Sequence, residues 1–209
     1  RELDKDDPFK QWMPDNLDIP DLNMFKEKTN DLFFQFDELG QQLLEAIALD
    51  LNLNSNFFHN ITDKGNSVMR VIHYPPVDRK EKGERAGAHE DINLITLLCA
   101  STEAGLEVMD HDGSWFKVET GPEFIVVDTG DMIQNITNGL FKSTTHRVKA
   151  IGDEAMTSRY SIPFFVHPNP DWFIKTLENQ INESHPNMYP KGILAEDFLQ
   201  ERLKEIKLM

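Results

Sequence analysis

His89 and Asp91 are separated by a single residue and stand directly before the apolar segment 92–99. On an extended chain, residues i and i+2 point to the same face, so this imidazole and this carboxylate project together while Glu90 points away. They would supply two of the three ligands of a 2-His-1-carboxylate metal site. A hydrogen-bonded pair at the surface is the alternative interpretation of so short a pattern.

A third ligand would have to come from another strand, and four histidines downstream are candidates. His146 is the one that lies within a strand-like segment, residues 143–149. The others lie in a turn, where we expect a solvated side chain, or directly before a proline in irregular chain: His111, His167 and His185. His146 is therefore the candidate for a metal ligand on a second strand.

Arg159 and Ser161 form another i, i+2 pair, thirteen residues after His146. A guanidinium with a hydroxyl beside it is suited to holding a carboxylate by charge-assisted hydrogen bonds. An acid that chelates a metal would use such a clamp at its far end.

Helical periodicity predicts the elements at both ends of the chain. Asp21 can cap a helix over residues 22–51, either continuous or broken near Gly40, whose apolar stripe is expected to pack in the core. A short helix is expected to start at Asn54 or Ser55, and the tail 196–208 returns to a helical period. The long stripe comprises Phe25, Leu32, Phe36, Leu39, Leu43, Ile47 and Leu51.

Between these helices the chain has short apolar, β-branched segments separated by glycine, proline and aspartate. Asp112-Gly113 predicts a hairpin, and Gly130-Asp131 predicts another sharp turn. Since no helical patterns separate the segments, a sandwich or jelly roll is favoured over a parallel doubly wound sheet. We expect eight strands, at 67–74, 92–99, 105–109, 114–118, 123–128, 131–136, 143–149 and 158–166.

Composition limits the classes of partner. With 209 residues and a formal net charge of -15, the chain would repel nucleic acid, and it has no apolar run of the roughly 20 residues that cross a bilayer. The single cysteine, Cys99, is expected to be a buried thiol in a reducing cytoplasm. The oligomeric state is left open. Because the first residue is Arg1 and not Met, we expect that an N-terminal segment is missing.

The order of these residues resembles the Fe(II)- and 2-oxoglutarate-dependent oxygenases, in the isopenicillin N synthase-like branch. The resemblance runs from about residue 20 to the end and depends on several motifs in the same order. These are Tyr74-Pro75-Pro76, Gly87-Ala88-His89-x-Asp91, Gly105-Leu106, Gly130-Asp131, Asn135, Ser143-x-x-His146-Arg147-Val148 and Arg159-x-Ser161.

The resemblance implies a mainly β fold with flanking helices, a double-stranded β-helix (jelly roll). It divides the chain into an N-terminal helical region (1–64), a catalytic core (65–170) and a C-terminal extension (171–209), packed as one domain. The cofactors it implies are Fe(II), 2-oxoglutarate and O2, and the reaction is oxidation of a C–H bond in a small molecule with release of succinate and CO2. The residues it assigns are His89, Asp91 and His146 to the metal, and Arg159, Ser161 and Tyr74 to 2-oxoglutarate.

Three departures from the family pattern are visible. Ile72 stands where relatives often have asparagine, Glu107 stands where many have glutamine, and the distance from His146 to Arg159 is a few residues longer than usual. Two other functions share these residues. One is an iron oxidase of the same fold that does not use 2-oxoglutarate, and the other is a cupin-like metal-binding protein or hydrolase.

The substrate contacts are less defined. Arg70 shares a strand face with Ile72 and Tyr74, so it could reach an acidic substrate or form a structural salt bridge. The pair Phe164-Phe165 is expected to be mostly core, with one ring facing inward. The charged segment 77–87 is expected to form either a mobile flap at the pocket mouth or an ordinary solvated loop.

Overall fold

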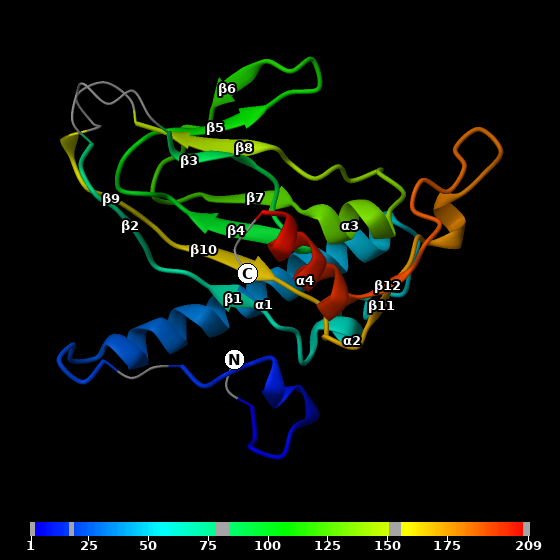
Figure 1. The fold of residues 1–209 in the computed structure, drawn as a ribbon, viewed down its shortest axis with the longest axis horizontal. Helices are drawn as coiled ribbons and strands as arrows, with labels where there is room; N and C mark the ends of the chain where they lie inside the picture. Colours follow the sequence, from blue (N-terminus) through cyan, green and yellow to red (C-terminus); the bar gives the residue numbers. More distant parts are fainter. Residues whose placement is uncertain (1–2, 17–18, 78–83, 151–155, 207–209) are drawn as a thin grey trace.

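Two four-stranded antiparallel sheets make up most of the fold, in a computed structural model that describes residues 3–16, 19–77, 84–150 and 156–206 (Figure 1). The first sheet has the strand order β1-β10-β4-β7, and the second has the order β3-β8-β5-β6. Their strands are β1 (Val68–Met69), β10 (Pro163–Val166), β4 (Ile95–Cys99), β7 (Ile125–Thr129), β3 (Glu84–His89), β8 (His146–Lys149), β5 (Leu106–Met109) and β6 (Trp115–Lys117).

A short ladder between β2 (Ile72–Tyr74) and β9 (Arg159–Ser161) stands beside the two sheets. The sequence predicts one strand over 67–74 and one over 158–166. In the structure each is divided in two, because β1 and β10 pair within the first sheet while β2 and β9 pair with each other. This ladder places Tyr74 directly opposite Arg159.

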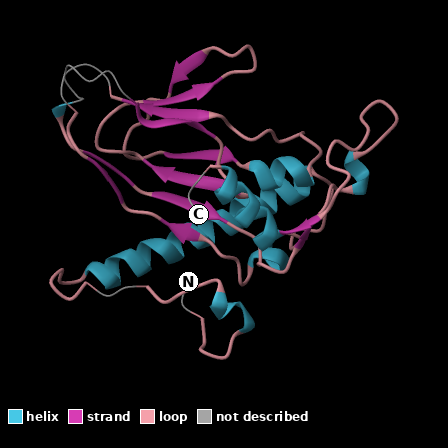
Figure 2. Cartoon of the chain, in the orientation of Figure 1, coloured by secondary structure: helices cyan, strands magenta, loops and turns pink. Residues whose placement is uncertain are grey.

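The long helix α1 (Phe25–Asp50) packs along the first sheet (Figure 2). Phe36 stacks on Phe164 with ring centroids 5.4 Å apart. The helix is continuous through Gly40, where an added Cβ would lie 3.1 Å from Val166, so glycine allows a close approach to β10. The stripe is therefore core, as predicted, but the helix begins after Asp21, which does not cap it.

The remaining helices are short. The helix expected from residue 54 or 55 begins later, because residues 55–58 form turns. The C-terminal helix, expected over 196–208, is observed as Ala195–Glu205. Hairpin strands β11 (Phe173–Ile174) and β12 (Ile193–Leu194) had no predicted counterpart. The other elements are η1 (Pro8–Gln11), α2 (His59–Thr62), α3 (Asp131–Ile136), η3 (Glu178–Gln180) and α4 (Ala195–Glu205).

The predicted strand at 131–136 is wrong, because these residues form α3. This segment of six residues, three of them apolar, is too short for periodicity to distinguish a strand from a buried helix. Here the first helical amides find acceptors outside the helix: Asp131 N–H donates to the Asp91 carbonyl at 2.8 Å, and Met132 N–H donates to the Asn93 carbonyl at 3.0 Å. These bonds satisfy donors that a helix start leaves free and attach α3 to the segment that carries Asp91.

The predicted turn at Asp112-Gly113 is present, whereas Gly130-Asp131 forms the start of α3, and the expected flap is only partly described. Asp112-Gly113 lies in the loop that joins β5 to β6, with Gly113 at φ +83°. Residues 78–83 of the expected flap lie outside the described residues. Its last part, residues 84–87, belongs to β3, which pairs with β8 and is therefore not a loop.

The buried core takes side chains from both helical ends of the chain and from the sheets, among them Leu44, Leu97 and Ile174. The division of the chain into three regions, with boundaries at 64/65 and 170/171, stays a prediction.

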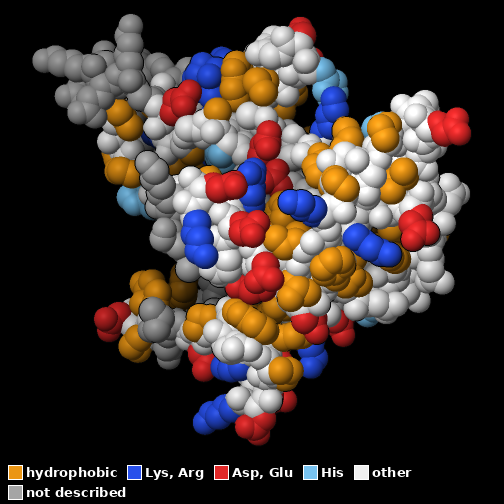
Figure 3. Space-filling view, turned by 45° about the vertical axis from the view of Figure 1, so that its right-hand side comes forward, with side chains coloured by type: hydrophobic (Ala, Val, Ile, Leu, Met, Phe, Trp, Pro, Cys, Tyr) orange, Lys and Arg blue, Asp and Glu red, His pale blue; other side chains and the backbone are white. Residues whose placement is uncertain are grey.

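Cys99 is half-buried and free, so it is less enclosed than expected. On the face seen in Figure 3, acidic and basic side chains are interspersed with apolar ones. No helix in the described ranges is long and apolar enough to cross a membrane.

Candidate metal centre and active-site cavity

A cavity of about 300 Å³ is lined by strands of both sheets and by the β2–β9 ladder. Its size suits a small molecule. It contains every residue that the sequence assigned to metal or cosubstrate, together with Arg70, Arg85, Thr96, Asp128 and Phe165. Inward-pointing positions alternate along most of these strands, as with Thr96 and Leu98 of β4. In β3, where the register with β8 shifts, the neighbours Arg85 and Ala86 both line the cavity.

His89, Asp91 and His146 converge at one point of this cavity. Their candidate ligand atoms all lie within 4.8 Å of one another. Asp91 Oδ1 lies 3.9 Å from Nε2 of His89 and 3.9 Å from Nε2 of His146. The β3–β8 register explains this meeting, because His89 and His146 are paired residues on adjacent antiparallel strands.

The hydrogen bonds of the two imidazoles prepare them for a metal. His89 Nδ1 lies 2.7 Å from the Gly87 carbonyl oxygen, and His146 Nδ1 lies 3.0 Å from the Thr144 carbonyl oxygen. A carbonyl only accepts, so each Nδ1 carries the proton. The neutral tautomer then has its lone pair on Nε2, facing Asp91, which is the arrangement of metal-binding histidines. The three side chains therefore fit a divalent ion such as Fe(II).

Asp91 is fixed by neighbours on β4 and by α3. Thr96 Oγ1 donates to Asp91 Oδ2 at 2.5 Å and accepts from Asn93 Nδ2 at 2.7 Å. Gly130, which precedes α3, lies so close to this segment that an added Cβ would stand 2.2 Å from Asn93 Oδ1. The Thr96 hydrogen bond occupies Oδ2 and leaves Oδ1 directed to the histidines. Thr96 was not among the predicted site residues, because this contact is not visible in a linear pattern.

Arg159 is 1% exposed, lines the cavity and keeps one donor nitrogen without a partner. Its Nη2 donates to Ser101 Oγ at 2.8 Å and its Nε to the Glu103 carbonyl oxygen at 3.1 Å, while Nη1 is buried without a hydrogen-bond partner. Burial lowers the pKa of Arg159 from its usual value. A buried guanidinium with an unused donor fits the carboxylate of a ligand.

Ser161 and Tyr74 lie beside Arg159, as the clamp requires. Ser161 is buried two residues along β9, opposite Ile72. The guanidinium carbon of Arg159 lies 5.3 Å from the centroid of the Tyr74 ring. Among the residues that the structure describes, Arg159 forms no ion pair with a carboxylate, so an anionic ligand would provide its counter-ion.

Asp128 is a second carboxyl group in the cavity that was not predicted from the sequence. It is paired with Thr96 across β4 and β7, and its Oδ1 is buried without a hydrogen-bond partner. Burial, with a smaller contribution from the negative charge of Asp91, raises the pKa of Asp128 to about 8. The signal that could have revealed it is an acid at the end of the apolar run Ile125-Val126-Val127.

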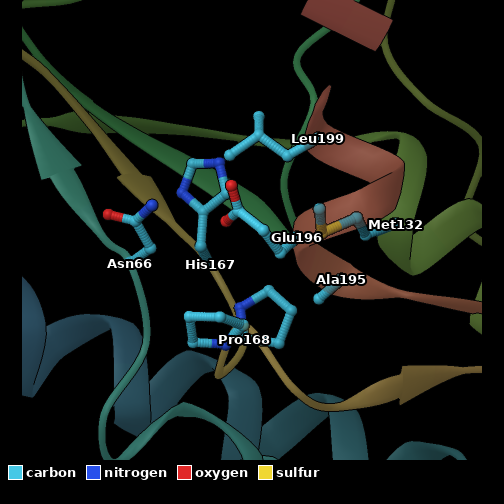
Figure 4. A pocket seen from close by; sticks show the side chains of 8 residues that line it. Asn66, Met132, His167, Pro168, Ala195, Glu196 and Leu199 are labelled. Atoms are coloured by element: carbon cyan, nitrogen blue, oxygen red, sulfur yellow. The ribbon is translucent and has the colours of Figure 1, made fainter. Parts of the chain in front are cut away.

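A second, much smaller cavity lies between β10 and α4, next to His167 (Figure 4). Its volume of about 10 Å³ is that of roughly one water molecule. His167 Nδ1 lies 3.2 Å from the Phe165 carbonyl oxygen, and burial lowers the pKa of the imidazole. His167 is therefore a core histidine. His111, in the β5–β6 turn, is exposed as expected and takes no part in the metal centre.

Comparisons with known proteins agree with this geometry. Residues 65–168 match the family model of the 2OG-Fe(II) oxygenase superfamily. Among curated proteins, a 2-oxoglutarate-Fe(II) type oxidoreductase of Emericella nidulans is 36% identical over 90% of this chain and 54% of its own length. The chain spans about half the length of the curated relatives that it matches first.

Two solved structures are similar over most of the chain. A protein of Caulobacter crescentus, assigned to the 2OG-Fe(II) oxygenase family, is 42% identical with a TM-score of 0.91, over 99% of this chain and 67% of that one. A full-length protein of Neurospora crassa, solved in complex with alpha-KG, which is 2-oxoglutarate, is 31% identical with a TM-score of 0.79, over 88% of this chain and 58% of that one. The expected double-stranded β-helix is thereby confirmed. In sequence motifs, fold and metal-site geometry, the chain belongs to the 2OG-Fe(II) oxygenase superfamily.

Proposed function

We propose that this protein is an Fe(II)- and 2-oxoglutarate-dependent oxygenase that oxidises a C–H bond of a small molecule. The observation that carries the proposal is the presence, in one cavity, of a His-Asp-His cluster and a buried arginine with an unused donor. The first group suits the metal and the second suits the distal carboxylate of the cosubstrate. When bound, iron and 2-oxoglutarate supply the oxidising chemistry, in which O2 is consumed and succinate and CO2 are released.

The residues of the chain have separate roles in this proposal. His89, Asp91 and His146 hold the metal on one side, which leaves the other side open to ligands. Arg159 and Ser161 bind the far carboxylate of 2-oxoglutarate, with Tyr74 as a hydrogen-bond donor beside them. Binding at both ends fixes the orientation of the cosubstrate relative to the metal.

The test uses the purified chain with Fe(II), 2-oxoglutarate and O2, and it measures succinate formation together with oxygen uptake. The proposed function predicts succinate that depends on both iron and 2-oxoglutarate. Oxygen uptake without succinate would favour an iron oxidase of the same fold. Hydrolysis supported by zinc, with no oxygen uptake, would favour a cupin-like hydrolase.

The remaining expectations about partners stay predictions. The cavity volume of about 300 Å³ supports a small-molecule substrate. The formal net charge of -15 argues against nucleic acid as a partner, and the single unpaired Cys99 is compatible with a cytoplasmic location.

A further inference from the structure

Three arginines line the active-site cavity, although the chain as a whole is strongly acidic. Arg159 is the proposed partner of the cosubstrate carboxylate. Arg85 in β3 donates from Nη2 to the Thr157 carbonyl oxygen at 2.6 Å. Within the described part of the chain, the guanidinium of Arg70 forms no hydrogen bond or ion pair. The fold therefore gives no structural reason for this third arginine.

Arg70 lies four residues before Tyr74, on the segment that leads into β2, and so stands away from Arg159 along the chain. Its backbone N–H donates to the Pro163 carbonyl oxygen at 3.0 Å, whereas Tyr74 pairs with Arg159. Four residues of extended chain separate the α-carbons of Arg70 and Tyr74 by roughly 13 Å. Arg70 and Arg159 thus line the same cavity from well-separated backbone positions.

The surface next to Arg70 is apolar. Phe164 and Phe165 point in opposite directions from β10: Phe164 packs against α1, and Phe165 lines the cavity together with Pro163 and Leu98. A cation beside aromatic and aliphatic side chains is the usual composition of a site for an organic anion with an apolar body. Arg70 lines the cavity and is also exposed to solvent, so a ligand can reach it.

The charges of the loaded cavity leave Arg70 without a counter-ion. An Fe(II) ion and Arg159 would bring three positive charges, and 2-oxoglutarate and Asp91 would bring three negative charges, so the positive charges of Arg85 and Arg70 stay in excess. Of these two arginines, Arg85 has a neutral carbonyl as hydrogen-bond partner, and the guanidinium of Arg70 has no partner among the described residues. The other cavity carboxyl, Asp128, lies on β7, at the opposite edge of the sheet from β1. A negative group on the substrate would neutralise Arg70 by a charge-assisted, bidentate hydrogen bond.

We propose that Arg70 binds a carboxylate of the oxidised substrate, so that the substrate is a small organic acid whose apolar part lies against Phe165. This inference rests on the proposed function, since it assumes that Arg159 and the His-Asp-His cluster are occupied by 2-oxoglutarate and iron.

The experiment compares organic acids with their primary amides, which have the same shape without the charge. Benzoate, 3-phenylpropanoate and hexanoate, each with its amide, are titrated calorimetrically into the anaerobic protein loaded with Fe(II) and 2-oxoglutarate. We expect at least one acid to bind at least tenfold more tightly than its amide. In Arg70→Gln this preference should fall to within twofold, while the Kd of 2-oxoglutarate stays within twofold of the parent. Arg70→Lys, which keeps the charge, should retain part of the preference.

Arg85→Gln is the matched control, because it removes another cavity arginine that already has a partner. It should keep the preference for the acid. Equal binding of acid and amide by the parent, no binding of any acid, or an unchanged preference in Arg70→Gln would overturn the inference. So would loss of 2-oxoglutarate binding in Arg70→Gln, since that would assign Arg70 to the cosubstrate. Failure of the proposed function is seen separately, as a parent protein that releases no succinate with iron and 2-oxoglutarate.

Discussion

Thr96 and Asp91 are joined by a short hydrogen bond, in which Thr96 Oγ1 donates to Asp91 Oδ2 at 2.5 Å. The other oxygen of this carboxylate lies 3.9 Å from His89 Nε2 and from His146 Nε2. The threonine therefore selects which carboxylate oxygen faces the metal centre. Groups that orient metal ligands in this way contribute strongly to metal affinity.

Replacing Thr96 with valine should weaken metal binding without removing a ligand. The hydroxyl that orients Asp91 is lost, so the Kd for Fe(II) should rise by about 10- to 100-fold. Thr96→Ser keeps the hydroxyl and should restore most of the affinity. Thr145→Val, which removes a surface hydrogen bond to Glu90, is the matched control and should bind iron as the parent does. An unchanged Kd in Thr96→Val would show that Asp91 is held by other contacts.

Alanine substitutions of the metal-site residues should abolish iron binding and turnover. His89→Ala, Asp91→Ala and His146→Ala each remove one of the converging ligand atoms. Equilibrium binding of Fe(II) and succinate release are the measurements. His111→Ala removes an exposed histidine outside the cluster and should change neither. Activity at the parental level in any of the three cluster variants would contradict the assignment.

The sequence alone is informative about this centre because its geometry depends on strand alternation. His89 and Asp91 follow an i, i+2 rule, and so do Arg159 and Ser161, which makes shared faces readable from spacing. The meeting of His89 with His146 depends on the β3–β8 register, which no local pattern encodes. For that step the resemblance to a family supplied what periodicity does not.

The features that were not predicted from the sequence depend on contacts between distant segments. Residues 131–136 form a helix whose first amides donate to carbonyls of the Asp91 segment, and the six residues themselves contain no sign of that partner. Asp128 becomes a cavity residue through its pairing with Thr96. Tertiary context decides such cases, in which two local conformations have similar propensities.

Removing the Arg159 guanidinium should reduce the affinity for 2-oxoglutarate. In Arg159→Ala, a partly buried carboxylate would lack its counter-ion, which costs about 2 to 5 kcal/mol, or roughly 30-fold or more in Kd. Calorimetric titration of the iron-loaded, anaerobic variant measures this, and its Kd for Fe(II) should stay near that of the parent. An Arg159→Ala protein that binds 2-oxoglutarate as tightly as the parent would exclude this role.

The raised pKa of Asp128 makes the stability of the metal-free protein depend on pH. With a pKa of about 8 in the folded state and an ordinary value in the unfolded chain, the folded state binds more protons between those two values. The free energy of unfolding is therefore highest in mild acid and decreases as the pH rises toward 8. Asn has no proton to lose, so Asp128→Asn should not show this decrease.

We expect the metal-free Asp128→Asn protein to be more stable than the parent at pH 8 by about 1 to 3 kcal/mol, with a difference that shrinks at pH 5. Thermal or urea unfolding at both pH values measures it. Asp112→Asn is the control: the hydrogen bonds from Ser114 lower the pKa of Asp112, so this group is ionised from pH 5 to 8 and its variant should keep the pH dependence of the parent. Adding Mn(II) should reduce the difference in unfolding free energy between Asp128→Asn and the parent at pH 8, because a cation beside Asp91 favours the ionised form of Asp128. Stability profiles of Asp128→Asn and parent that run parallel from pH 5 to 8 would show that Asp128 is ionised throughout that range.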